Sequence, residues 1–287
     1  MAWFILAIST AFFEAVRDLF NKTKLKTFDE YTVTFFLALL TVMFLLPWVL
    51  RSPPSNLASP FWPTLLADGS LNTVAYVALI RAIKLADLSI VAPLTALTPL
   101  FLLLTSPILV GEFPPALSLL GVLSIAIGSY VLNVNKGQQH WLAPFRAMLV
   151  EPGPRLAVIV AFLWSITSNL DKIGIQASRP IFWVMMVYGV VAIALFPAIA
   201  LQYRGRWQQL PRIGMHLLPI GLTNAAAVAC QMVALKLTLV VYVISIKRTS
   251  AVFSVLFGHL FLGEKHLRSR LAGSVLMVLG AIFIALA

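Results

Sequence analysis

Ten apolar runs, each of roughly membrane-spanning length, dominate the sequence and limit what it can fold into. A helix needs about 20 mainly apolar residues to cross the ~30 Å hydrocarbon layer of a bilayer, and charge, Pro, Gly and Asn separate the runs. Hydrophobic residues make up 60% of the 287-residue chain. The pattern predicts an all-α integral membrane protein with ten transmembrane helices, at residues 2–21, 31–50, 62–84, 88–110, 115–133, 155–177, 180–202, 212–236, 239–262 and 267–286.

The formal net charge of +11 does not indicate a nucleic-acid partner, because most cations lie between the apolar runs. Lys and Arg at such positions set membrane topology and meet anionic lipid headgroups. Glu14, Arg17 and Asp18 lie where a cleaved signal peptide would be apolar, so the first run is expected to be a retained span. Cys230 is the single cysteine, which excludes an intramolecular disulfide and a cysteine metal cluster.

The second half of the chain repeats the first. Residues 69–133 match 221–285 at a constant offset of 152 without a gap, and near the start of each half the offset becomes 150, which pairs Lys22 with Lys172 and Asn21 with Asp171. The match predicts a duplicated five-helix unit, with repeats at residues 1–135 and 154–287 and a linker at 136–153. It depends on these coinciding pairs: Gly69/Gly221, Asn72/Asn224, Lys84/Lys236, Gly111-Glu112/Gly263-Glu264, Gly121/Gly273 and Gly128/Gly280.

An odd number of helices in the repeat means that the second copy enters the membrane from the opposite side. The two halves are therefore expected to be inverted about an axis in the membrane plane. Inverted repeats are typical of secondary transporters, whose substrate site lies near the midplane between the halves. This symmetry is the main functional inference from the sequence.

The Gly-Glu pairs, each followed by a Gly-rich helix, carry a resemblance to a known family. Ten helices in two fives with Gly-Glu at 111–112 and 263–264 resemble the drug/metabolite transporter superfamily, specifically its EamA-type members. The resemblance implies an alternating-access carrier of small organic solutes. It also implies a central cavity lined by the first, third, fourth, sixth, eighth and ninth helices, with the fifth and tenth peripheral.

Lys247 and Arg248 are adjacent cations inside the apolar run 239–262, about 12 Å from its start at 1.5 Å per residue. Ionisable groups at such depth cost ~2.5–3.5 kcal/mol on insertion scales and usually face a bundle interior or a wet cavity. In the similar plastid sugar-phosphate translocators, a Lys-Arg pair on the ninth helix holds the substrate phosphate. Two interpretations stay open and are compatible: a substrate site, or an internal ion pair with Glu14, Asp18, Asp68 or Asp171.

The first helix places four polar residues on one face. Glu14, Arg17, Asp18 and Asn21 follow the spacing i, i+3, i+4 and i+7, so they share a face that cannot look at lipid. Arg17 can pair locally with Glu14, so a structural clamp is weighed equally against a role in coupling or binding. Asp171 occupies the place of Asn21 in the second half and belongs to the same candidate set.

Further candidates for substrate binding follow from helical spacing. Ser250 shares a face with Lys247, and the remaining candidates are Asn72 and Tyr76 on the third helix and Asn224 and Gln231 on the eighth. For the asparagines, the competing interpretation is an interhelical hydrogen bond worth ~0.6 kcal/mol.

Prolines in the run 88–110 indicate an interrupted helix. Pro93 and Pro99 predict a gate that bends during transport or, equally, a fixed kink. The equivalent run 239–262 contains no proline, so unequal bending of the two halves is expected. Gly121, Gly128 and their equivalents recur every seven residues and predict close helix packing.

No motif for catalysis, nucleotide or metal binding is present in the sequence. It lacks HExxH, GxSxG and GxxxxGK[ST], and no His has a second ligand at metal-binding spacing. We therefore expect no enzyme activity, no cofactor, no metal and no direct use of ATP. Proton coupling and simple exchange both stay open, as do a monomer and a homodimer.

The sequence thus favours a secondary transporter of a small polar metabolite in the cell inner (plasma) membrane, anionic or zwitterionic, such as an amino acid or a phosphorylated compound. Alternatives are an exporter of drugs or cationic compounds with the same fold, then a channel or an intramembrane enzyme. Assigned to alternate sides, the loops place fourteen Lys and Arg residues on one side and Arg51, Lys172, Arg179 and Lys236 on the other. The positive-inside rule then predicts that both chain termini lie outside, whereas the superfamily resemblance implies termini inside.

Overall fold

The computed structural model describes residues 1–24, 28–54, 56–86, 91, 94–133, 150–262 and 267–286. All ten predicted spans contain helix within these ranges, and the fourth and ninth spans are each interrupted. A short 3₁₀ helix, η1 (Trp207–Gln209), precedes the eighth span. The helices are α1 (Ala2–Lys24), α2 (Glu30–Arg51), α3 (Phe61–Leu85), α5 (Thr98–Leu109), α6 (Ala116–Asn133), α8 (Pro152–Ala177), α9 (Pro180–Gln202), α10 (Leu210–Leu237), α11 (Val240–Lys247), α12 (Ser250–Leu262) and α13 (Leu267–Leu286).

The outer surface of the bundle matches a membrane environment. Large apolar side chains such as Leu104, Ile108 and Ile193 are 66–81% exposed, which would be unfavourable in water over such an area. Five helices in the described ranges are long and apolar enough to span a bilayer, and others are shorter. The chain is a multi-pass membrane protein.

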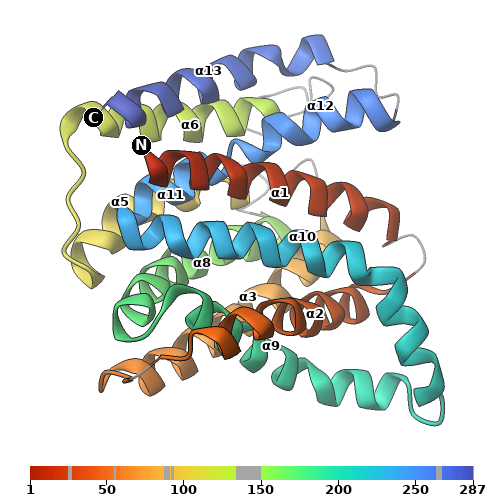
Figure 1. The fold of residues 1–287 in the computed structure, drawn as a ribbon. Helices are drawn as coiled ribbons and strands as arrows, with labels where there is room; N and C mark the ends of the chain where they lie inside the picture. Colours follow the sequence, from red (N-terminus) through yellow and green to blue (C-terminus); the bar gives the residue numbers. More distant parts are fainter. Residues whose placement is uncertain are drawn as a thin grey trace.

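Helix pairing follows the predicted inverted symmetry (Figure 1). Helix α1 packs against α10 as its repeat equivalent α8 packs against α3, while α2 pairs with its own equivalent α9 and α6 with α13. Each pair joins one half to the other. The predicted fold class, ten transmembrane helices in two inverted five-helix repeats, is confirmed.

Glycines allow the closest of these contacts. A Cβ atom on Gly121 would lie 2.7 Å from the carbonyl oxygen of Gly280, and one on Gly128 would lie 2.7 Å from that of Gly273. The backbones of α6 and α13 therefore touch directly, as small residues permit in membrane helices. The packing role predicted for these glycines is confirmed, and it places α6 and α13 at the edge of the bundle (Figure 1).

The ninth span is interrupted at Arg248 and Thr249, so the expectation of one continuous helix over 239–262 was wrong. The fourth span is interrupted at Ala96 and Leu97, the equivalent positions at the offset of 152. In both halves a tight i→i−3 bond precedes the second segment, from Leu97 N to Leu94 O at 3.2 Å and from Thr249 N to Ile246 O at 2.9 Å.

Both halves are thus interrupted at equivalent positions, and unequal bending during transport stays a prediction. Pro99 occupies the first turn of α5, where its missing N–H removes no helical bond. In the second half Thr249 favours the interruption instead of a proline. Its hydroxyl donates to Ile246 O at 2.7 Å and so competes with backbone N–H groups for a helical carbonyl.

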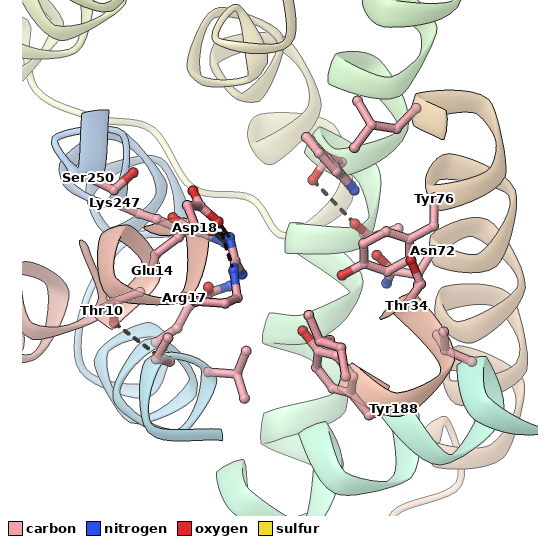
Figure 2. Close-up of a pocket in the computed structure, with 18 of the residues that line it drawn as sticks. Thr10, Glu14, Arg17, Asp18, Thr34, Asn72, Tyr76, Tyr188, Lys247 and Ser250 are labelled. Carbon is pink, nitrogen blue, oxygen red and sulfur yellow. Dashed lines mark hydrogen bonds and ion pairs between the residues drawn. The ribbon is translucent and has the colours of Figure 1, made fainter. Parts of the chain in front are cut away.

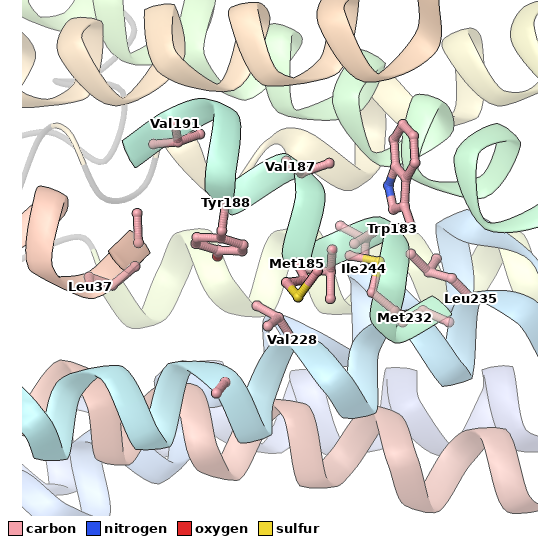
Figure 3. Packing of buried hydrophobic residues seen from close by; sticks show 14 of the residues in the cluster. Leu37, Trp183, Met185, Val187, Tyr188, Val191, Val228, Met232, Leu235 and Ile244 are labelled. Carbon is pink, nitrogen blue, oxygen red and sulfur yellow. The ribbon is translucent and has the colours of Figure 1, made fainter. Parts of the chain in front are cut away.

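The bundle has two ends, a terminal face and a linker face. The terminal face bears the chain ends, the loop 52–60 and the corner 238–239; the linker face bears the end of α6, the start of α8 and the loop 203–209 (Figure 1). A buried apolar cluster between α9 and α10 includes Trp183, Met232 and Leu235 (Figure 3). These residues lie near the terminal face, where α9 begins and α10 ends.

Candidate functional site

A cavity of about 770 Å³ lies between the two halves (Figure 2). Its walls come from α1, α3, α5, α8, α10, α11 and α12, as expected, and none of its lining residues belongs to α6 or α13. The predicted lining was nevertheless incomplete, because α2 and α9 also contribute, with Leu37 and Tyr188 among others. Helices α2 and α9 pack on each other across the halves, which brings their inner faces to the cavity.

The cavity reaches the linker face and is closed toward the terminal face. Asn21, Phe28 and Asp29 line it where α1 ends and α2 begins. At the opposite end, Phe61 lies against Phe182 and Trp183, with ring centroids 5.6 and 5.7 Å apart. In this structure the cavity therefore opens toward the linker face.

Asp29 joins two helices at the open end. Its carboxylate accepts hydrogen bonds from Thr32 N at 3.0 Å, from the Thr32 hydroxyl at 2.6 Å and from Gln202 Nε2 of α9. Partial burial raises the pKa of Asp29, but the bonds from Thr32 and Gln202 outweigh burial and leave the pKa below its usual value. Asp29 is therefore a carboxylate at neutral pH.

The predicted polar face of α1 forms one connected ion cluster. Arg17 donates to Glu14 Oε1 at 3.1 Å and to Asp18 Oδ1 at 2.8 Å, and its Nη1 reaches Asn224 Oδ1 at 3.1 Å. The Arg17 and Glu14 side chains are only 18% and 12% exposed. Arg17 is thus held by two carboxylates and an amide, which leaves it few donors for a solute.

Lys247 joins this cluster from the second half of the chain. Its ammonium lies 3.3 Å from Glu14 Oε1, the oxygen that also accepts from Arg17. Both Lys247 and Glu14 line the cavity. The internal ion pair considered for Lys247 is therefore present, and it lies in the cavity wall rather than apart from it.

Arg248 has different surroundings from Lys247, although the two are adjacent. Its Nη2 donates to the Thr98 hydroxyl at 2.8 Å, and its guanidinium carbon lies 5.7 Å from the centroid of the Trp164 ring. Its buried Nε has no hydrogen-bond partner, and in the described part of the chain no carboxylate forms an ion pair with it. Arg248 is therefore an oriented cation with donors to spare.

The opposite wall is polar and aromatic. Figure 2 shows Asn72, Tyr76 and Tyr188 facing the charged cluster of α1 and α11 across the cavity. On α8, Asp171 accepts from Trp183 Nε1 at 2.8 Å. The cavity therefore has a cationic side and a side of hydroxyl, amide and carboxyl groups.

Most of the residues predicted as site candidates line this cavity. They are Glu14, Arg17, Asp18, Asn72, Tyr76, Asp171, Gln231, Lys247, Arg248 and Ser250. Asn224 does not: it is fully buried, donates to the Thr41 hydroxyl at 2.9 Å and supports Arg17 from behind. Its placement corresponds to the interhelical hydrogen bond that was weighed against a binding role.

Of the two prolines proposed as a gate, Pro99 is buried at the start of α5. Pro93 lies outside the described residues, as do Gly263 and Glu264 and nearly all of the linker.

Several lining residues were missed as binding candidates. Thr98 and Trp164 contact Arg248, and Tyr188 faces the charged cluster across the cavity, yet threonine and aromatic residues are common in apolar helices and give no signal alone. Trp164 is the repeat equivalent of Glu14, and this equivalence could have identified it from the sequence as a cavity-lining residue. Within the described ranges, no group of three His, Cys, Asp or Glu residues could hold a metal ion.

Comparison with known families agrees with this architecture. The model of the EamA-like transporter family matches residues 1–134 and 152–286. The chain belongs to the EamA-like transporter family. The resemblance to EamA-type members of the drug/metabolite transporter superfamily is thereby confirmed, and the chain is a membrane transporter of that type rather than a member of an enzyme family.

A similar fold also occurs among solved structures. One protein of known crystal structure is similar over 99% of this chain and 96% of its own, with a TM-score of 0.77 and 17% sequence identity. Identity at this level shows the fold alone. No curated protein matches the sequence significantly.

Proposed function

We propose that this EamA-family chain is a secondary carrier that moves a small anionic or zwitterionic metabolite through the central cavity by alternating access. A volume of about 770 Å³ falls in the range of sites for small organic ligands. The inverted halves supply the symmetry on which alternating access depends in other carriers.

The surroundings of Arg248 are the observation from which we infer that the substrate is anionic or zwitterionic. A guanidinium binds carboxylate or phosphate through two parallel hydrogen bonds, and Arg248 keeps donors free while Thr98 and Trp164 fix its orientation. Such preorganisation reduces the entropy lost on binding.

Within the ion cluster of α1 and α11 the charge balance supports the same conclusion, while Asp29 and Asp171 line other parts of the cavity. Arg17, Lys247 and Arg248 face two carboxylates, Glu14 and Asp18, so this cluster has one positive charge in excess. A solute group with one negative charge would neutralise this excess positive charge. A solute with more charge would compete with Glu14 for Lys247.

A zwitterion would use both sides of the cavity. Asp171 follows Trp164 by seven residues on α8, about 10 Å along the helix axis. Favoured zwitterions therefore carry their charges several ångströms apart. An α-amino acid, whose charges are adjacent, would engage Arg248 and leave Asp171 to water or to a side-chain donor.

Export of cationic compounds is the weaker alternative. It would need free carboxylates, but Glu14 and Asp18 already pair with Arg17 and Lys247. Asp171, bonded to Trp183, is the remaining acidic group of the inner wall. Only displacement of these internal pairs would open a cation site.

Reconstituted protein tests the proposal. Purified chain would be screened by thermal shift against carboxylates, phosphorylated compounds and amino acids, because a ligand at 100 times its Kd stabilises by about 2.7 kcal/mol. Hits would then be followed as labelled solutes in proteoliposomes, with and without unlabelled solute inside and with an imposed pH gradient. Counterflow supports exchange, gradient dependence supports proton coupling, and binding of cations alone would refute the substrate class.

A further inference from the structure

We propose that Glu112 and Lys172 form a latch that closes the terminal face of the cavity, positions α11 and must open when the carrier changes state. Here "latch" denotes these two side chains and the corner between α10 and α11 that they hold. The inference rests on the alternating access of the proposed function but not on the substrate.

Lys172 has every donor of its ammonium in use. Nζ lies 2.7 Å from Leu235 O, 2.7 Å from Thr238 O and 3.1 Å from Glu112 Oε1. An ammonium has three N–H donors, so these three contacts satisfy it. Both carbonyls belong to the end of α10, where a cation is favoured by the helix dipole.

Glu112 completes the latch from the other half of the chain. Its second oxygen, Oε2, accepts from Val240 N at 2.6 Å. Val240 is the first residue of α11, where backbone N–H groups lack helical acceptors and a carboxylate is favoured. One carboxylate therefore caps α11 while its partner cation caps α10.

Gly111 explains how the chain aims Glu112 at this corner. Its φ of 67° lies in the left-handed region that glycine adopts readily. The turn lets Glu112 N donate to Ser106 O at 3.3 Å and sends the carboxylate toward α11. The Gly-Glu pair thus has a structural task in this chain.

The latch connects directly to the candidate site. Lys172 adjoins Asp171, which lines the cavity, and α11 extends from the latch at Val240 to Lys247. Because α11 has only eight residues and ends at the helix break, fixing its first residue also fixes the position of the two cations at its other end. Glu112 and Lys172 are therefore positioning residues for Lys247 and Arg248.

The pair is also a closure, because it crosses between the halves. Glu112 belongs to the first half, and Lys172 and Val240 belong to the second. Inverted-repeat carriers exchange access by moving one half against the other, so bonds that cross the halves at the closed face must break. Both side chains are 11% exposed, and removing one partner of a buried pair leaves the other uncompensated.

Thiol labelling from each side of the membrane tests the latch without any substrate. The background is Cys230→Ala with Ser250→Cys as reporter, since Ser250 lines the cavity beside the break between α11 and α12 and is only partly buried, so that labelling from the terminal face requires that face to open. A second variant with Leu57→Cys, on the exposed loop 52–60, identifies that face. An impermeant reagent should label the reporter from the linker face only.

Glu112→Gln and Lys172→Met should raise reporter labelling from the terminal face about tenfold, equivalent to ~1.4 kcal/mol in the balance of two states. Glu112→Asp, which keeps the charge, should retain most of the protection. Arg179→Gln is the matched control: its bond to Ser52 O also crosses the halves on this face, but it is exposed to solvent. An exposed bond contributes little, so labelling should stay close to that of the parent. Folded Glu112→Gln and Lys172→Met proteins with unchanged labelling would overturn the proposal and make the pair a permanent brace.

A bridged variant covers the case in which these substitutions prevent folding. Glu112→Cys with Lys172→Cys, in the Cys230→Ala background, would be joined by a short crosslinker that a reductant cleaves. Counterflow of a solute identified with the parent protein should fall at least tenfold when bridged and return on cleavage. Full counterflow in the bridged protein would refute the latch, whereas absence of transport by the parent would refute the proposed function and leave the labelling result to decide the latch.

Discussion

At the scale of single residues, the cavity separates two adjacent cations that the sequence presents as a pair. Lys247 is neutralised by Glu14 at 3.3 Å, whereas Arg248 contacts only a hydroxyl and an aromatic ring among the described residues. The break between α11 and α12 lies at Arg248 itself. A continuous helix would place the two side chains about 100° apart, so their different partners follow from both the break and the packing.

Arg248→Gln should weaken binding of an anionic solute by about ten- to a hundredfold, because hydrogen bonds to charged groups contribute ~1.5–3 kcal/mol. Arg248→Lys should recover only part of this loss, since an ammonium cannot form the paired bonds of a guanidinium. Isothermal titration measures the affinities, and Arg204→Gln on the exposed loop is the control. Equal affinity in Arg248→Gln and parent would remove Arg248 from the site.

Glu14→Gln should tighten binding of an anion several-fold, because it removes the internal carboxylate that competes for Lys247. The same change should lower the melting temperature, since Arg17 and Lys247 lose a partner. Titration and thermal unfolding of one preparation separate the two effects. Weaker binding instead would indicate that Glu14 contacts the solute, as a cation carrier requires.

At the scale of elements, the halves share interrupted helices and glycine-lined contacts. Equivalent tight turns at Leu97 and Thr249 arise from different residues, a proline in one half and a threonine in the other. Discontinuous helices at mid-membrane are typical of carrier binding sites because their ends offer unpaired backbone groups. The interruption is therefore present in both halves although the residues around it differ.

Gly121→Ala should destabilise the protein by about 1–3 kcal/mol, the usual cost of overpacking, because its Cβ would lie 2.7 Å from Gly280 O. Gly189→Ala is the matched control, since a Cβ there meets nothing within 4 Å. It should be neutral or stabilise by up to ~1 kcal/mol through helix propensity. Thermal unfolding in detergent compares the two, and equal melting temperatures would contradict direct backbone contact of α6 and α13.

At the scale of the whole molecule, the proposed alternating access makes this structure one of two states of the carrier. The cavity reaches the linker face at Asp29, while Phe61, Trp183 and the Glu112–Lys172 latch close the terminal face. Loop cations are concentrated on the linker side of the sequence. The positive-inside rule then makes this the state open to the cytoplasm.

Both termini are accordingly predicted outside the cell. In a Cys230→Ala background, Ala2→Cys should react with an impermeant thiol reagent in intact cells, whereas Gln209→Cys should react only after lysis. The second site lies on the loop at the linker face. The reverse pattern would place the termini inside, as the superfamily resemblance implies, and would make the described state open to the exterior.

The sequence by itself determined the spans, the duplication, its inversion and most of the polar residues that line the cavity. These are local properties: apolar length, residue spacing and a constant offset can be read along the chain without knowing which helices touch. Glu14, Arg17 and Lys247 were recognised from the sequence because a charged side chain within a membrane span usually faces the bundle interior or a water-filled cavity.

Only the tertiary structure decided which polar groups meet. The separate partners of Lys247 and Arg248, the supporting role of Asn224 behind Arg17, the inner faces of α2 and α9 and the task of Glu112 all depend on contacts between residues far apart in the chain. Spacing gives the face of a helix but not the neighbour opposite that face. In a bundle of similar apolar helices, packing of the two halves supplies that neighbour.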